Sequence, residues 1–227
     1  MPTGDDRTLA ACIYCGAAPE TRDHVPSLVL LDEPFPENLP VIPSCRACNR
    51  SFSLHEEYCA ALIDCVTVGT AEPTTRHRAK VRKILEYQPA LAAALRAARS
   101  VNPVNGAVSF APDVDRLRTI ALKLARGHAA FELHTVDDEE PSTVSIVPLP
   151  LLDDASREAF ESPPVACLYP EVGSRAMTRI FGHDVPSPSW IVVQPGRYRF
   201  LASPGLPLLV RVVIGEYLGR EMVWEQG

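Results

Sequence analysis

The sequence predicts an α+β fold with a small cysteine-clamped unit of two strands and a helix, a helical middle and a β-rich C-terminal region. Three observations predict it. Two Cys-x-x-Cys pairs lie near the N-terminus, and apolar residues recur at helical spacing between about 46 and 133. After residue 142, short β-branched runs alternate with turn residues, as strands do. We therefore divide the chain into three parts, 1–70, 71–135 and 136–227.

The two cysteine pairs are Cys12–Cys15 and Cys45–Cys48. Two residues between thiolates let both sulfurs reach one ion, and two such pairs complete a tetrahedral zinc site with four sulfur ligands. The gap of 29 residues between the pairs is longer than the ~15–20 residues of a simple zinc ribbon. The sequence therefore predicts a structural zinc with a functional insert between its two halves. Cys59, Cys65 and Cys167 lie in apolar surroundings, where we expect them to be buried.

The expected elements follow from the placement of proline and of apolar residues. Residues 10–44 are rich in proline, so only short strands fit there, and we expect 25–31 to pair with 39–42 as a hairpin. Ser44 is the expected N-cap of a helix over 46–66. Further helices are predicted over 75–87, 90–99 and 114–133, a loop over 100–112, and strands over 143–148, 165–169, 190–194, 197–202, 208–217 and 220–224.

Composition places the chain among ordinary globular proteins, with 46% apolar and 22% charged residues. No apolar run approaches the ~18–20 residues that span a bilayer, and the first residues lack the apolar core of a secretory signal. We expect a cytoplasmic protein with no membrane partner. In that reducing compartment, cysteines bind metals more often than they form disulfides.

The net charge of −6 hides a strong asymmetry along the chain. Residues 1–73 carry a balance of −7, residues 74–126 one of +8, and residues 127–227 one of −7. A basic middle can contact a phosphate backbone, although a solvated helix face explains it equally well. The acidic flanks predict modest general affinity for DNA, which is compatible with a homodimer or an activating protein partner.

The insert between the cysteine pairs carries the residues with chemistry. Asp23 is a hard oxygen ligand suited to Mg²⁺ or Mn²⁺, and Asn49, directly after the second pair, offers an amide oxygen to the same ion. His24 can take a proton from water near neutral pH. A carboxylate, an amide and a base around a hard cation fit the hydrolysis of a phosphodiester.

The order of these residues resembles the HNH endonucleases of the ββα-metal superfamily, in their four-cysteine zinc branch, over residues 12–57. The resemblance implies that Asp23 and Asn49 bind the catalytic ion, that His24 is the general base and that Asn38 orients it. It also implies that Cys12, Cys15, Cys45 and Cys48 hold the zinc, and that the substrate is nucleic acid, with DNA expected. Many members carry a phosphate-binding lysine where this chain has Phe52, so Arg46 and Arg50 are expected to supply that charge.

Other polar residues are open to two interpretations. Arg76, Arg78 and Lys80 can track a phosphate backbone or form a surface helix. Glu56 or Glu57 can face the ion, but a solvated helix face is favoured for both, and His55 is expected on the surface. Two other functions remain open for the whole chain: a non-catalytic zinc module that binds nucleic acid or protein, and an effector-binding protein whose main role lies in residues 75–227.

Overall fold

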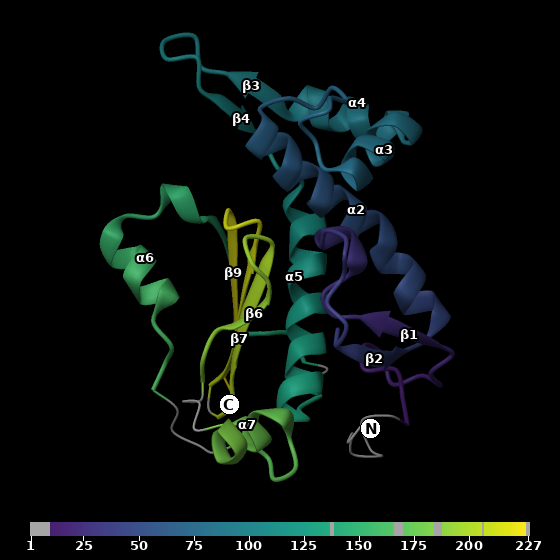
Figure 1. Ribbon diagram of the computed structural model, residues 1–227, viewed down its shortest axis with the longest axis vertical. Helices are drawn as coiled ribbons and strands as arrows, with labels where there is room; N and C mark the ends of the chain where they lie inside the picture. The colour runs from purple at the N-terminus through teal and green to yellow at the C-terminus, as the bar shows by residue number, and fades with distance from the viewer. Residues whose placement is uncertain (1–9, 137–138, 166–169, 184–187, 206, 226–227) are drawn as a thin grey trace.

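In the computed structural model, residues 10–136, 139–165, 170–183, 188–205 and 207–225 are described. The fold mixes helices with strands, and all strand pairs among these residues are antiparallel. Helix α5, Val114–His128, runs through the middle of the molecule (Figure 1). The cysteine-bearing hairpin and α2 lie on one side of α5, and a five-stranded sheet lies on the other.

The N-terminal unit is a short hairpin followed by a long helix. Strand β1, Thr21–His24, pairs with β2, Val41–Ser44, so that Asp23 lies opposite Ile42. Helix α2 then runs over Arg46–Val68, as predicted. The predicted position of the first strand, 25–31, was wrong, because Leu28–Leu30 forms a 3-10 turn rather than a strand. The chain therefore enters β1 at Thr21, four residues earlier than predicted.

The N-cap of α2 is Cys45 rather than the predicted Ser44. Its sulfur accepts a hydrogen bond from the backbone N–H of Cys48 at 3.3 Å, which is the work of a capping side chain. Ser44 is fully buried and donates to the carbonyl of Cys45 instead. The first turn of α2 is thus built from the same residues that form the second cysteine pair.

The helical middle contains three helices, one of which is shorter than predicted. The predicted loop 100–112 is wrong in part, because Arg99–Val101 (β3) and Val108–Phe110 (β4) form a small hairpin beside α4 (Figure 1). Helix α5 passes directly into a π-helical turn, Ala129–Leu133 (η2). The helix and the turn together occupy the predicted helix 114–133. The other two helices are α3, Ala79–Tyr87, and α4, Pro89–Ala98.

The C-terminal region is a five-stranded sheet with the strand order β5-β9-β8-β7-β6, in which β6 to β9 form a meander and β5 pairs with β9. Five of the predicted strands occur close to their expected positions, and the prediction over 165–169 falls almost wholly outside the described residues. Two helices, α6 (Asp154–Glu161) and α7 (Arg175–His183), lie in the long connection before β6. The strands are β5 Thr143–Pro148, β6 Ile191–Gln194, β7 Tyr198–Ser203, β8 Leu208–Ile214 and β9 Leu218–Trp224.

One apolar core joins the three predicted parts of the chain. It includes Val25 and Ile42 from the hairpin region, Leu124 from α5, and Val212 from β8. Helix α5 approaches the hairpin at Gly127, where a Cβ would lie 2.7 Å from Cγ2 of Val25. Cys59 and Cys65 are fully buried, as predicted, whereas Cys167 lies outside the described residues. None of the described helices is long and apolar enough to cross a membrane.

Candidate functional site

Four cysteine sulfurs meet at the base of the hairpin. The sulfurs of Cys12, Cys15, Cys45 and Cys48 all lie within 4.8 Å of one another, and those of Cys15 and Cys45 are 3.7 Å apart. Tetrahedral ligands about 2.3 Å from a zinc ion lie nearly 4 Å apart, so this set fits the ion that the spacing predicts. The cluster could hold a metal such as zinc.

Local backbone structure prepares both halves of this cluster. Gly16 has a φ of 72°, a conformation that glycine adopts without strain, and its N–H donates to the carbonyl of Cys12 at 2.8 Å. Burial opposes ionisation of Cys12, but hydrogen bonds from the backbone of Cys45, Tyr14 and Cys15 lower its pKa to about 7. Thiolates are the form that binds zinc, so these hydrogen bonds favour the ligand state of Cys12, whereas burial raises the pKa of Cys48.

Asp23 faces inward and is only 6% exposed. Its carboxylate accepts hydrogen bonds from the hydroxyl of Tyr14 at 2.8 Å and from the ammonium of Lys123 at 3.0 Å. Burial, followed by the charge of Asp23, raises the pKa of Tyr14 well above its usual value, which keeps the phenol protonated as a donor. The carboxylate of Asp23 is therefore already paired with a cation, the ammonium of Lys123 on helix α5.

Lys123 is the centre of this buried charge network. Its side chain is 1% exposed, and its ammonium also donates to Oγ of Ser27 at 2.9 Å and to the carboxylate of Glu56. The hydroxyl of Ser27 donates in turn to Glu56. The ammonium thus has three oxygen-bearing partners, which offset the free-energy cost of burying it. The network carries two carboxylates and one ammonium.

Glu56 corrects an expectation, because the sequence favoured a solvated helix face for it. Its side chain is 14% exposed and pairs with Lys123 across the gap between α2 and α5. Phe52, one turn earlier on α2, stacks edge-on against Tyr14 with ring centroids 4.8 Å apart. Phe52 therefore packs beside the network at the position where the resemblance expects a phosphate-binding lysine. His55, expected on the surface, is half-buried.

The other predicted site residues occupy separate places. His24 follows Asp23 at the end of β1, is half-buried, and has no hydrogen-bond partner for its buried Nδ1 among the described residues. The amide nitrogen of Asn49 donates to Oγ1 of Thr21 at 3.2 Å. Asn38 is exposed and lines a groove on the hairpin. Within the described part of the chain, no hydrogen bond joins Asp23, His24 or Asn49 to one another.

The predicted nucleic-acid contacts fall into two groups. Arg46, Arg50 and Arg76 are exposed, so their side chains are open to a partner. Arg78 instead pairs with Asp32 at 2.6 Å and donates to the carbonyl of Leu31 at 2.7 Å.

Lys80 similarly contacts its own fold rather than open solvent. Its ammonium donates to the carbonyl of Leu28 at 3.2 Å and lies 3.9 Å from the ring centroid of Phe35. These contacts favour a structural role for Arg78 and Lys80 over contact with a phosphate backbone, because they hold the loop after β1 against α3.

Comparison with family models, with curated proteins and with solved structures finds no match to this chain. A functional assignment therefore rests on the chain's own residues. Sequence reasoning missed Lys123, Tyr14 and Ser27, although Lys123 gives a signal. It lies three residues after Ile120 on the apolar face of α5, where a charged side chain needs a buried partner.

Proposed function

We propose that the protein is a zinc-stabilised endonuclease of the HNH type that hydrolyses phosphodiester bonds in nucleic acid, with DNA as the expected substrate. The observation that carries the proposal is the four-cysteine cluster, which ties the hairpin bearing Asp23 and His24 to the first turn of α2. A hairpin and a helix held by zinc can position side chains from both elements without a large core of their own.

His24 is the proposed general base. It takes a proton from a water molecule, and the hydroxide formed attacks phosphorus while the bond to the leaving oxygen breaks. Its place at the end of β1 suits this role, because the half-buried ring keeps contact with solvent. The partnerless Nδ1 is consistent with a ring that is not committed to a structural hydrogen bond.

A divalent ion held by Asp23 and Asn49, such as Mg²⁺ or Mn²⁺, belongs to the same proposal. In the arrangement described, such an ion does not fit. Lys123 and Tyr14 engage both oxygens of Asp23, and the amide of Asn49 donates to Thr21. Binding an ion there would require Lys123 to withdraw, because an ammonium and a divalent cation repel each other. We therefore assign the ion no step.

The ion pair between Lys123 and Asp23 favours a second candidate function, a non-catalytic zinc module that binds nucleic acid or protein. In that function Asp23 is a structural anion that fastens β1 to α5, and the fold needs no second metal. The two candidates share the zinc cluster and differ in whether His24 moves a proton.

A plasmid-nicking assay with Mg²⁺ or Mn²⁺ separates them. Wild-type protein is expected to nick, and His24→Ala is expected to lose about 100-fold or more, the usual contribution of a general base. His55→Ala is the matched control, since His55 is also half-buried with a partnerless Nδ1 among the described residues but lies on α2. Equal nicking by wild type and His24→Ala, or no nicking with either ion, supports the non-catalytic module.

A further inference from the structure

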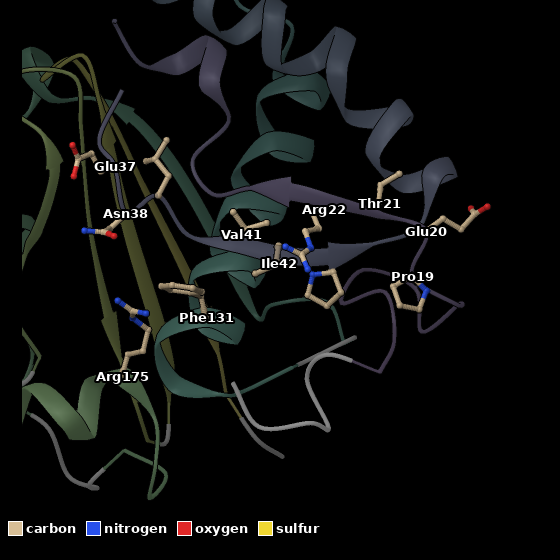
Figure 2. Close-up of a pocket in the computed structure, with 12 residues that line it drawn as sticks. Pro19, Glu20, Thr21, Arg22, Glu37, Asn38, Val41, Ile42, Phe131 and Arg175 are labelled. Atoms are coloured by element: carbon tan, nitrogen blue, oxygen red, sulfur yellow. The ribbon is translucent and has the colours of Figure 1, made fainter. Parts of the chain in front are cut away.

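A groove of about 850 Å³ lies along the hairpin (Figure 2). The hairpin forms one wall, and the opposite wall comes from the π-helical turn and the start of α7. The side chains that give it chemical character are Arg22, Asn38, Phe131 and Arg175.

Two arginines and one aromatic ring line the groove, with Arg22 near its middle and Arg175 and Phe131 toward the end that carries Asn38 (Figure 2). Arg22 is exposed on β1 and forms no ion pair within the described residues. Arg175 is exposed at the start of α7, and its guanidinium lies 4.4 Å from the ring centroid of Phe131. Guanidinium groups pair with phosphate, and an aromatic face stacks on a base. These are the two contacts by which proteins hold single-stranded nucleic acid.

Acidic residues occur only toward the two ends of the groove. Glu37 is exposed beside Asn38, and Glu20 lies at the opposite end, directed outward (Figure 2). The carboxylate of Glu20 accepts the backbone N–H of Arg46 at 3.2 Å, which fixes it at the rim. The two arginines therefore suit a short phosphate-bearing segment, whereas the acidic residues disfavour a long polyanion lying flat along the whole groove.

The groove also adjoins the proposed catalytic residue. Arg22 lies two residues before His24 in β1, and strand alternation directs both side chains to the same face of the hairpin. Asn38, which the resemblance assigns to the catalytic loop, lines the same groove. A strand bound here would lie on the face of the hairpin to which His24 also points.

We propose that this groove binds a single-stranded segment of the nucleic-acid substrate, with its phosphates on Arg22 and Arg175 and an unpaired base on Phe131. The choice of ligand rests on the proposed function, while the groove itself is independent of cleavage. A paired duplex does not satisfy the arrangement, because stacking on Phe131 requires a base that has left its partner.

Fluorescence anisotropy with a labelled eight-nucleotide strand tests the proposal, using single-stranded DNA, RNA of the same sequence and the DNA duplex. Arg22→Gln and Arg175→Gln are each expected to weaken binding of the single strand about 10-fold. Each is also expected to reduce the slope of log K against log salt by about 0.7, the effect of one lost phosphate contact. Phe131→Leu is expected to weaken binding without changing the slope.

Lys83→Gln is the matched control, because it removes one exposed positive charge from α3, away from the groove. Its binding is expected to equal that of the wild type. Binding that is unchanged in both arginine variants overturns the proposal, as does a duplex that binds as tightly as the single strand. Tighter binding of the RNA strand than of the DNA strand supports the groove and identifies RNA as its preferred ligand.

The His24→Ala protein keeps this test distinct from the test of cleavage. It is expected to bind the single strand like the wild type, since His24 does not line the groove. Binding without nicking by the wild type refutes the endonuclease and leaves the groove standing. Nicking by the wild type, together with no measurable binding of the single strand by the wild type, refutes the groove and leaves the endonuclease standing.

Discussion

The ammonium of Lys123 lies 2.9 Å from a carboxylate oxygen of Asp23, and the two residues stand 100 positions apart in the chain. This contact joins the first strand of the cysteine-bearing unit to the central helix. Both side chains are almost wholly removed from solvent. The N-terminal unit is therefore anchored to the rest of the protein by charge as well as by apolar packing.

The first prediction concerns the removal of this anchor. Lys123→Met leaves Asp23 and Glu56 as buried carboxylates without a cation, so we expect the free energy of unfolding to fall by about 3–5 kcal/mol. Urea unfolding followed by circular dichroism measures the loss. The triple variant Lys123→Met, Asp23→Asn, Glu56→Gln is expected to recover most of it, because no uncompensated charge remains. Lys83→Met, at an exposed position, is the control and should change stability little.

The sequence was sufficient to predict the elements with strong local signals. The cysteine spacing predicted a four-sulfur cluster, and helical periodicity predicted α2 and α5 almost to their ends. The second strand of the hairpin was expected to end at Ile42, but β2 continues through Pro43, opposite Arg22, where a proline normally argues against a strand. The hairpin of β3 and β4 was missed because β3 is fully exposed and shows no apolar alternation.

The candidate site was predictable in its residue types and not in its partners. Asp23 and His24 were recognisable from their position between the cysteine pairs. That Asp23 pairs with a lysine from α5 depends on how that helix crosses the hairpin. The crossing is set by tertiary packing at Gly127 and Val25, which local sequence patterns do not encode. The groove also depends on tertiary packing, because Phe131 and Arg175 lie far from the hairpin in the sequence.

The second prediction is that the purified protein contains one zinc ion per chain. Structural zinc in small domains contributes about 10 kcal/mol or more to folding, so chelation is expected to unfold the N-terminal unit. Cys45→Ser should lose the ion, because it removes a ligand and alters the cap of α2. Elemental analysis gives the metal content. Cys65→Ser, which changes a buried cysteine outside the cluster, should retain a full zinc ion. Its loss of zinc would contradict the assignment of ligands.

The third prediction concerns the close approach of α5 to the hairpin. In Gly127→Ala the new Cβ would lie 2.7 Å from Cγ2 of Val25 and 3.3 Å from Cδ1 of Ile42. We expect a loss of about 1–3 kcal/mol from overpacking, although alanine is the better helix former. Adding Val25→Ala should relieve the clash, so the double variant is expected to lose less than the sum of the two single variants. Strict additivity would show that the two residues are not in contact.

The fourth prediction concerns the pH dependence of stability. His128 is fully buried, stacks on Phe200 at 3.6 Å between ring centroids, and shares a hydrogen bond of 2.8 Å with the hydroxyl of Tyr198. Burial, reinforced by the positive charge of Lys123, lowers the pKa of His128 from 6.5 to about 3. Above pH 6.5 the ring is neutral in both the folded and the unfolded chain, so pH has no effect through it.

Between pH 6.5 and 3 the unfolded chain binds a proton at His128 that the folded protein does not. The free energy of unfolding should therefore fall by about 1.4 kcal/mol for each pH unit below 6.5. Carboxylates add their own pH dependence, so the informative quantity is the difference between wild type and His128→Gln in urea unfolding at pH 7, 6 and 5. The variant is expected to lose about 2 kcal/mol less than the wild type between pH 7 and pH 5. Parallel losses in the two proteins would mean that the ring becomes protonated inside the folded protein, which the apolar stack against Phe200 opposes.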